Sequence, residues 1–482
     1  MNRKAVFYNV GKALLVNALF MLVSVVISVV DGCDDAFVPL VISFMLTAIV
    51  GAFPFIFVGK VRDYSLKDGF VTIILSWILS FLFGALPYLL YGGEFNVINA
   101  WFESVSGYTT TGSTILTDIE ALPRSLLFWR SSTHFIGGLG VVVFLLLIIP
   151  DASPFKYRLS SLEISSMSRT GYRYRSGMTV RVMLSVYVGL ALAETILLRL
   201  AGMSWFDAVN HSFSTVATGG FSTRNISIMY YDSPVIDIII LVFMTLASIH
   251  FGCIYAMLIR RSLKPLLNTV TKYYLKVIVV LSVAIMLVLL IQGGYSSPWK
   301  ALLDSSFQVV SFISTTGFGQ ADNAIWPFFA NFLLIFASVH CGCSGSTTGG
   351  IKADRMFIIS KAVSCEFKKR LHPSSVFRVK VNGSVVREDE VSSVVLYFVA
   401  YIIVLFLSFI AILVCGVDIQ DAMSGTIASL GNVGPGLGQL GTMGNYASLP
   451  SVVKFIFSLD MFLGRVEIFP VLIVFYMIFK RK

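Results

Sequence analysis

Long apolar stretches recur along the whole chain and are separated by shorter polar ones. Each stretch has about the length that an α-helix needs to cross ~30 Å of hydrocarbon, whereas a transmembrane β-barrel would show alternating segments of ~10 residues. The pattern therefore predicts an all-α, polytopic membrane protein with about ten spans. The ten apolar runs lie at residues 11–30, 36–58, 69–91, 127–149, 179–200, 235–259, 274–292, 326–362, 391–416 and 451–479.

The runs are organised in pairs. The first two form an N-terminal helix pair within residues 1–66, and the other eight form four pairs that follow one plan. Internal repeats of this kind decide the fold, so we expect four pseudo-repeated helix–pore loop–helix units around one central pore. Their expected bounds are 67–177, 178–272, 273–388 and 389–482, and the polar, glycine-rich segment 341–350 breaks the second helix of the third repeat.

Composition and charge fit a membrane protein. Of the 482 residues, 56% are hydrophobic and 13% are charged, and a soluble fold could not cover such a surface with polar groups. The net charge of +10 could indicate nucleic-acid binding, but the basic residues gather in the loops between runs, which is typical of cytoplasmic loops. We therefore expect the lipid bilayer as the environment, no nucleic-acid partner and both termini in the cytoplasm. The basic residues concerned are Lys60, Arg62, Lys67, Lys156, Arg158, Arg169, Arg173, Arg175, Arg181, Arg260, Arg261, Lys264, Lys272, Lys276, Lys361, Lys368, Lys369, Arg370, Arg378, Lys380, Lys480, Arg481 and Lys482.

Each repeat carries a short, half-polar stretch and then a glycine triplet between its two apolar runs. A single triplet would be explained by small residues that pack helices together, but four at matching places indicate a common function. The third continues as Phe318-Gly319, whereas Ser113, Gly220 and Pro435 replace the aromatic residue elsewhere. The triplets are Thr110-Thr111-Gly112, Ala217-Thr218-Gly219, Thr315-Thr316-Gly317 and Asn432-Val433-Gly434.

The stretches before the triplets are too short to span a bilayer, so we expect half-helices that enter from the outer interface. Their C-terminal partial negative charge would favour a cation at the membrane centre. Polar residues 12–13 positions before each triplet glycine are candidate N-caps, namely Asn99, Asp207, Asp304 and Asp421.

The triplets have the properties of a cation filter. Glycine reaches positive φ and can turn successive carbonyls to one side, and irregular backbone is tolerated at membrane depth where it lines a wet cavity. Four such strands would replace the hydration shell of a monovalent cation, as the T-V-G-Y-G filters of potassium channels do. Because the four strands differ, we expect only approximate fourfold symmetry and fewer ordered ion sites.

Two features lie below the third and fourth triplets. Segment 341–350 concentrates four glycines in an apolar run, and each costs a helix of order 1 kcal/mol relative to alanine; a small-residue packing surface is the alternative. Arg465 lies in the last run, where a charge must face a cavity or a partner. The carbonyls of segment 341–350 are its expected partners, with extension to the cytoplasmic edge as the alternative.

These motifs resemble the Trk/Ktr/HKT superfamily of potassium transporters, and the N-terminal helix pair resembles its Trk-type membrane subunits. The resemblance implies potassium as the transported ion, because filter glycines in all four repeats, Gly112 included, go with potassium. It also implies that segment 341–350 gates the pore, with Gly345, Thr347, Gly349 and Gly350 as candidates, and that Arg465 repels cations below the filter. The motifs lie at residues 106–112, 210–221, 314–319, 431–436 and 464–469.

The resemblance further implies a homodimer in the bacterial cytoplasmic membrane and a cytosolic, ring-forming TrkA-type partner. NAD or ATP is expected on that partner, because the chain has no nucleotide-binding fingerprint and we expect no cofactor bound to it. The repeats have the same orientation, whereas an alternating-access carrier is typically built from inverted repeats, so we do not favour a carrier. The sequence contains no hydrolase motif, and we do not expect an enzyme. Passive gated conduction, proton-coupled symport and less selective potassium/sodium translocation stay open.

Three histidines, His134, His250 and His340, recur near the start of the second helix in repeats one to three, and Asp460 occupies that place in the fourth. A proton relay is conceivable, because histidine titrates near neutral pH. We prefer a supporting role, in which the rings hydrogen-bond behind the filter carbonyls.

Overall fold

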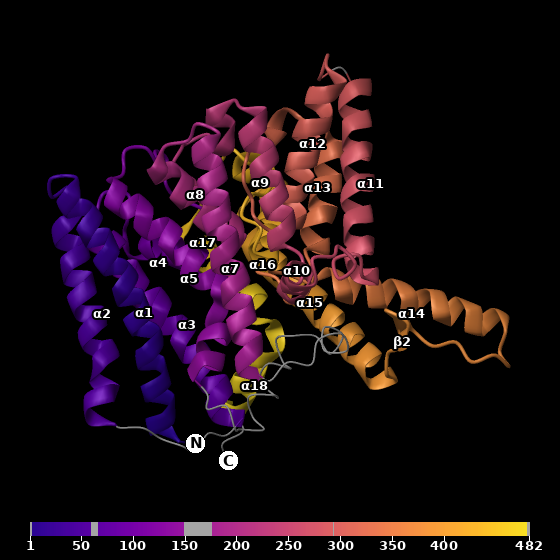
Figure 1. The fold of residues 1–482 in the computed structure, drawn as a ribbon, viewed down its shortest axis with the longest axis horizontal. Helices are drawn as coiled ribbons and strands as arrows, with labels where there is room; N and C mark the ends of the chain where they lie inside the picture. The colour runs from indigo at the N-terminus through magenta and orange to yellow at the C-terminus, as the bar shows by residue number, and fades with distance from the viewer. Residues whose placement is uncertain (1, 59–65, 149–175, 293, 480–482) are drawn as a thin grey trace.

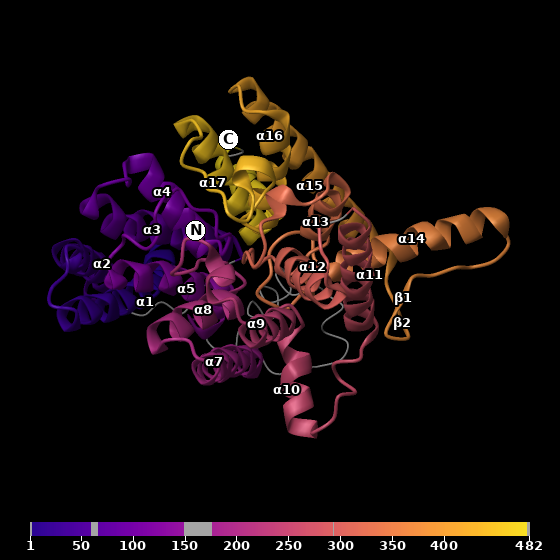
Figure 2. The same ribbon diagram turned by 90° about the horizontal axis from the view of Figure 1, so that it is seen from above.

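The structure, a computed structural model, describes residues 2–58, 66–148, 176–292 and 294–479. It is a helical bundle, which confirms the predicted fold class. Seen from above, the four repeats follow one another around a common centre, and the N-terminal pair lies outside the first repeat (Figure 2). Segments far apart in the sequence therefore meet at the centre of the bundle.

The N-terminal pair consists of α1 (Arg3–Val30) and α2 (Phe37–Phe57). These helices approach closely at Gly11 and Gly51, since a methyl group added at either would press on the backbone of the other. Side chains at the far end of α2, such as Ile56 and Phe57, are exposed, as lipid contact requires.

Each repeat has a long first helix, a half-helix and a second helix in one or two parts. The first repeat has α3 (Leu66–Tyr91), α4 (Val97–Tyr108) and α5 (Arg124–Ile148). The second has α7 (Ser176–Leu200), α8 (Trp205–Ala217), α9 (Pro234–Ala247) and α10 (Phe251–Arg260). The third has α11 (Thr269–Ile291), α12 (Pro298–Ile313), α13 (Phe328–His340) and α14 (Ala353–Leu371), and the fourth has α15 (Glu388–Val414), α16 (Ile419–Gly431), α17 (Ser451–Val466) and α18 (Ile468–Phe479).

Short elements complete the described part of the chain. Three 3-10 turns follow filter segments, η2 (Ser227–Tyr231), η3 (Asn323–Ile325) and η4 (Gly438–Leu440). A hairpin of β1 (Lys380–Val381) and β2 (Ser384–Val385) is antiparallel, with Lys380 opposite Val385.

Six described helices are long and apolar enough to cross a membrane, namely α1, α2, α3, α7, α11 and α15, and a bent pair, α9 and α10, makes a seventh if it counts as one span. The ten predicted runs are all present as helices, but those of the second helices do not run straight. The difference from the predicted count therefore lies in the second helices of the repeats.

The second helix is broken in all four repeats, whereas the sequence indicated a break only in the third. In α5 the break is at Gly140, with φ 65° and ψ 155°. The pair α9 and α10 bends by 103°, α13 and α14 are separated by residues 341–352, and Glu467 separates α17 from α18 with φ 63°. The prediction of continuous helices across 127–149, 235–259 and 451–479 was wrong, because the apolar pattern continues through these breaks.

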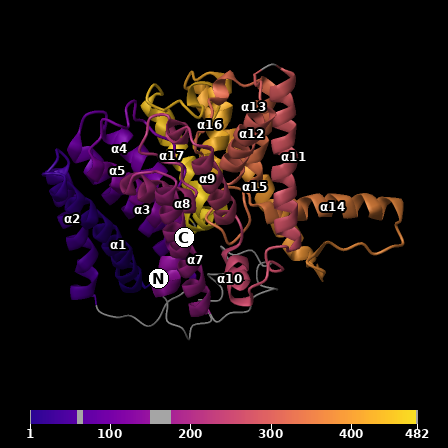
Figure 3. The same ribbon diagram turned by 45° about the horizontal axis from the view of Figure 1, so that its top comes forward.

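Both termini lie at one end of the molecule, which we call the termini side (Figure 1). Helix α14 projects from the bundle as an arm (Figures 1 and 3). The start of α11 and the arm carry basic residues on this side, among them Lys272, Lys368 and Lys369. Ten of the basic residues that predicted the orientation lie outside the described residues, within 59–65, 149–175 and 480–482. They are Lys60, Arg62, Lys156, Arg158, Arg169, Arg173, Arg175, Lys480, Arg481 and Lys482.

We expect Gly137→Ala to destabilise the bundle by about 1–3 kcal/mol, the usual cost of overpacking, because an added methyl group would overlap the Tyr108 carbonyl oxygen at the end of α4. Gly189→Ala on α7 is the matched control, since open space surrounds that position. Thermal unfolding in detergent measures both, and equal melting temperatures for the two variants would contradict this packing.

Candidate functional site

The four half-helices begin slightly earlier than the sequence predicted. Asn96 caps α4, Ser204 caps α8 and Asp418 caps α16, each by accepting a backbone N–H, and α12 begins with Pro298 in its first turn. The predicted caps Asn99, Asp207, Asp304 and Asp421 lie inside the helices instead. In α4, α8 and α16 the reason is capping chemistry, because a better-placed polar residue precedes the predicted one. In α12, Ser297 makes no side-chain cap bond and Pro298 starts the helix.

Each half-helix ends at a residue in the left-handed backbone conformation, and these residues set a common register. Their φ angles are 53° at Thr110, 56° at Thr218, 57° at Thr315 and 54° at Asn432. The next residue donates its N–H to a carbonyl five positions back in every repeat, with distances of 2.8–2.9 Å; the pairs are Thr111 to Ser106, Gly219 to Ser214, Thr316 to Ser311 and Val433 to Ala428.

This register corrects the second triplet. The residues that follow are all glycines with positive φ, namely Gly112, Gly220, Gly317 and Gly434. Gly220 therefore matches Gly112 in conformation, and the equivalent segment is 218–220 rather than the predicted 217–219. Ala217 is the last residue of α8. The sequence could not separate Gly219 from its neighbour Gly220, because only the backbone angle distinguishes them.

The four segments close a ring. A methyl group added to each of these glycines would overlap a carbonyl oxygen of the next repeat, and the fourth repeat returns to the first. Close approach of backbone to backbone at this point therefore requires glycine. The overlaps run from Gly112 to Gly219, from Gly220 to Thr316, from Gly317 to Val433 and from Gly434 to Thr111.

A cavity of about 90 Å³ lies at the mouth of the ring that faces away from the termini side. All four positive-φ glycines line it, together with Arg130 and Arg224. Close to this cavity, the Asn225 side chain donates to Asp118 Oδ1 at 2.8 Å, and this hydrogen bond lowers the pKa of the Asp118 carboxyl group. The cavity forms a polar entrance to the ring.

On the termini side, the non-helical segment 341–352 lies directly below the ring, as the sequence predicted for 341–350. The Gly349 N–H donates to Thr315 Oγ1 at 3.1 Å, which joins the segment to the third filter strand. Thr347 Oγ1 donates to the Val216 carbonyl at 2.9 Å. Gly345 and Gly350 have φ of 77° and 65° and lie against His250 and Cys341, so a side chain at either position would not fit.

Arg465 contacts this segment, as predicted. Its guanidinium donates to the Thr347 carbonyl at 2.5 Å and to the Gly137 carbonyl at 2.7 Å. One side chain from the fourth repeat therefore binds the first and third repeats below the ring.

Further charged residues beside Arg465 were missed in the sequence. Lys352, with φ 75°, donates to the Thr348 carbonyl, and Arg355 forms a 2.6 Å ion pair with Glu467. Lys352, Arg465 and Glu467 line a cavity of about 120 Å³ below the ring. Lys352 and Glu467 lie at helix breaks, and a charged residue inside an apolar run was the only indication of them in the sequence.

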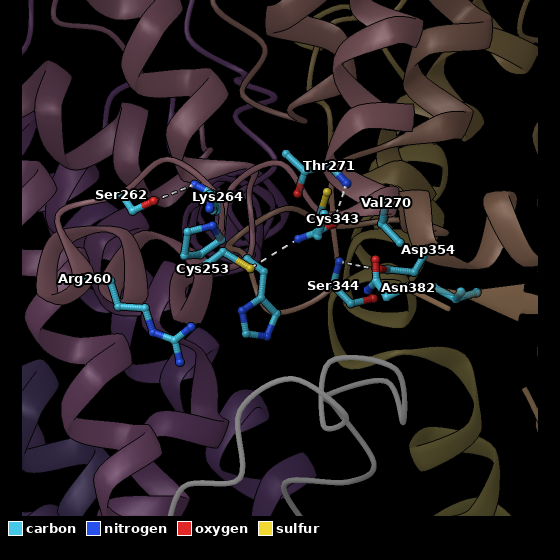
Figure 4. A pocket seen from close by; sticks show the side chains of 14 residues that line it. Cys253, Arg260, Ser262, Lys264, Val270, Thr271, Cys343, Ser344, Asp354 and Asn382 are labelled. Carbon is cyan, nitrogen blue, oxygen red and sulfur yellow. Dashed lines mark hydrogen bonds between the residues drawn. The ribbon is translucent and has the colours of Figure 1, made fainter. Parts of the chain in front are cut away.

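Another cavity, of about 460 Å³, borders segment 341–352 from the side of α10 and α11 (Figure 4). Cys343 and Ser344 line it, and Asp354 opposite them accepts the Ser344 N–H at 2.5 Å. The segment therefore has open space beside it.

The predicted hydrogen bonds from three histidines to filter carbonyls do not form in the described part of the chain, although His134 packs behind the filter. Its ring lies behind Gly219, stacks on Phe221 at 4.1 Å between centroids and pairs with Ser214 Oγ at 3.2 Å. His250 packs against Gly345, and His340 lies within 3.1 Å of the Cys341 carbonyl and of the Tyr273 hydroxyl. These two therefore contact segment 341–352 rather than the filter strands.

Comparison with known proteins gives the same picture. The family described as TrkH, "Cation transport protein", matches residues 39–481. The chain is 36% identical over 388 residues to proteins named "Trk system potassium uptake protein TrkH" from Salmonella typhimurium and Escherichia coli K12, which covers 80% of this chain and 80% of each relative. The crystal structure of the potassium transporter TrkH from Vibrio parahaemolyticus superposes with a TM-score of 0.88 at 32% identity and covers 98% of both chains.

With four ring-closing glycine segments, a non-helical segment beneath them and these matches along almost its whole length, the chain belongs to the TrkH family of cation transport proteins.

Proposed function

We propose that this chain takes up potassium across the bacterial cytoplasmic membrane as the membrane subunit of a Trk-type system. The observation that carries the proposal is the closed ring of four glycine segments, each at the C-terminal end of a half-helix. Carbonyls at this ring replace the hydration shell of a potassium ion, and the partial negative charge of four helix ends stabilises it there. Relatives named potassium uptake proteins support the choice of ion.

The ions bind to backbone carbonyls of residues 110–112, 218–220, 315–317 and 432–434. The ring is not symmetric, because Asn432 stands where the other repeats have threonine and its amide donates to Thr111 Oγ1 at 3.1 Å. We therefore expect selectivity for potassium and rubidium over sodium with few ordered ion sites.

Segment 341–352 acts as the gate. It contacts the third filter strand through Gly349 and is held in place by Arg465, whose charge opposes a cation that leaves the ring. The cavity of about 460 Å³ beside it leaves room for the segment to move aside.

The assembly is a homodimer with a cytosolic TrkA-type ring that carries NAD or ATP, and both termini face the cytoplasm. The α14 arm offers a docking surface, because Val363, Phe367 and Leu371 recur at every fourth position and are exposed. Lysines on the same helix, such as Lys368, fit a cytoplasmic location.

Proton-coupled symport is a second candidate, because the carboxyl groups of Glu194 and Asp460 are buried inside membrane helices. A proton could bind to such a group as potassium passes. Reconstitution separates the two candidates. We expect rubidium to enter potassium-loaded liposomes without an imposed proton gradient, and uptake that requires the gradient would favour symport. The absence of rubidium uptake under both conditions, with folded protein, would contradict the proposed function.

Gly112→Ser and Gly220→Ala should each lower the potassium-to-sodium flux ratio by about tenfold. Each added side chain sits at positive φ, with strain of about 1–3 kcal/mol, and overlaps a carbonyl of the next repeat. Liposome fluxes of the two ions measure the ratio.

Gly92→Ala is the matched control for these variants, because Gly92 has φ 80° with open space around it and lies outside the ring. It should keep the wild-type ratio. A normal ratio in Gly220→Ala would remove Gly220 from the filter and restore the register that the sequence suggested.

Arg465→Ala should raise basal potassium flux several-fold in liposomes that contain this chain alone, because it removes the charge and both carbonyl contacts below the ring. Arg199→Ala is the control, since Arg199 donates to the Met203 carbonyl at the far end of α7. Unchanged flux in folded Arg465→Ala, or an equal rise in the control, would exclude Arg465 from the gate.

A further inference from the structure

A buried ion pair joins the first repeat's half-helix to its second helix. Glu103 on α4 is 0% exposed and Arg130 on α5 is 1% exposed. Arg130 Nε and Nη2 both lie 2.8 Å from Glu103 Oε1. Charges are buried in this way at considerable desolvation cost, and the proposed filter and gate use neither residue.

The pair holds the segments that leave the ring. Glu103 accepts hydrogen bonds from Thr114 Oγ1 at 3.0 Å and from the Ile115 N–H at 3.1 Å. Arg130 donates to the Ser222 carbonyl at 3.3 Å, and its guanidinium lies 4.0 Å from the centre of the Phe221 ring. Both strands that follow Gly112 and Gly220 are therefore fixed to the same two side chains.

The other repeats also bond the half-helix to the strand that follows the ring glycine. His211 on α8 pairs with Ser222 Oγ at 2.9 Å, and Gln308 on α12 donates to the Ala321 carbonyl at 2.9 Å. Ser424 on α16 accepts the Leu437 N–H at 3.0 Å. A bond from each half-helix to the strand just beyond its glycine is thus general. The second repeat also uses a carboxylate, because Asp207 on α8 accepts from Thr223 Oγ1 at 2.7 Å, but the carboxylate of the first repeat is the one paired with a fully buried arginine.

The charges matter because Arg130 lines the outer cavity with the four ring glycines. A cation at this mouth repels an entering potassium ion, and low-dielectric walls strengthen that field. Glu103 compensates the charge of Arg130, much as Asp207 at 3.1 Å compensates Arg224 on the other side of the mouth.

We propose that Glu103 and Arg130 are positioning residues that determine cation selectivity and potassium affinity at the outer mouth. The pair fixes the strands that leave the ring in the first two repeats, and its internal neutralisation keeps the entrance open to cations. This inference rests on the proposed potassium conduction.

The test compares Glu103→Gln with the double variant Glu103→Gln/Arg130→Gln in liposomes. Glu103→Gln leaves the Arg130 charge uncompensated, so the external potassium concentration for half-maximal flux should rise about tenfold. The double variant should recover most of this rise while its potassium-to-sodium ratio stays below that of the wild type. Asp389→Asn, which disrupts an exposed pair with Arg387, should change neither quantity.

The inference would be overturned if folded Glu103→Gln kept the wild-type potassium concentration for half-maximal flux and the wild-type potassium-to-sodium ratio. It would also be overturned if the double variant needed as much potassium for half-maximal flux as Glu103→Gln. If Glu103→Gln does not fold, Gln308→Met tests the positioning role alone. Gln308→Met should lower the potassium-to-sodium flux ratio without changing the potassium concentration for half-maximal flux. An unchanged flux ratio would overturn the positioning role.

A readout without flux separates this inference from the proposed function. Potassium should raise the melting temperature of the wild type in detergent by mass action, and Glu103→Gln should need more potassium for the same rise. A wild type that is stabilised by potassium but does not conduct would contradict the proposed function alone. A variant with the wild-type potassium dependence would contradict the inference alone.

Discussion

Four glycine backbones that touch in a ring impose the main constraint on this structure. Each ring glycine lies against a carbonyl of the next repeat, and no side chain fits between them. The contact requires the four half-helices to end in the same way, and each is followed by a residue in the left-handed conformation with φ between 53° and 57°. The long first helices and the packing of Gly137 on Tyr108 serve to hold those ends in position.

Because one chain supplies all four sectors, each sector can carry different chemistry. Arg465 is present once and binds the first and third repeats from the fourth, whereas a symmetric tetramer would place four guanidinium groups around the axis. The Glu103–Arg130 ion pair likewise lies in the first repeat alone and contacts the second through Arg130. A ring built from a single chain can therefore combine a nearly symmetric set of carbonyls at its centre with different side chains above and below it.

The sequence predicted the repeats, the half-helices and three of the four ring segments in their correct register. The segment of the second repeat was predicted one residue too early, because Gly219 and Gly220 are adjacent and only the backbone angles tell them apart. The helix breaks at Gly140 and Glu467 were missed for a different reason. Hydropathy reports whether a segment is apolar, and α18 is as apolar as an unbroken span while Glu467 takes a φ of 63° just before it.

The missed breaks and the predicted arginine belong to one arrangement. A carbonyl in a continuous helix already accepts the N–H four residues later, so a break in the helix makes the neighbouring carbonyls more accessible to a guanidinium. The break at Gly140 comes three residues after Gly137, whose carbonyl accepts from Arg465, and Thr347 lies in the non-helical segment of the third repeat. Arg465 can therefore be buried below the ring, because the helices of the first and third repeats are broken beside the carbonyls that accept its hydrogen bonds. The same broken backbone that accommodates the charge also supplies a segment with space beside it, so burial of the arginine and mobility of the proposed gate share one structural cause.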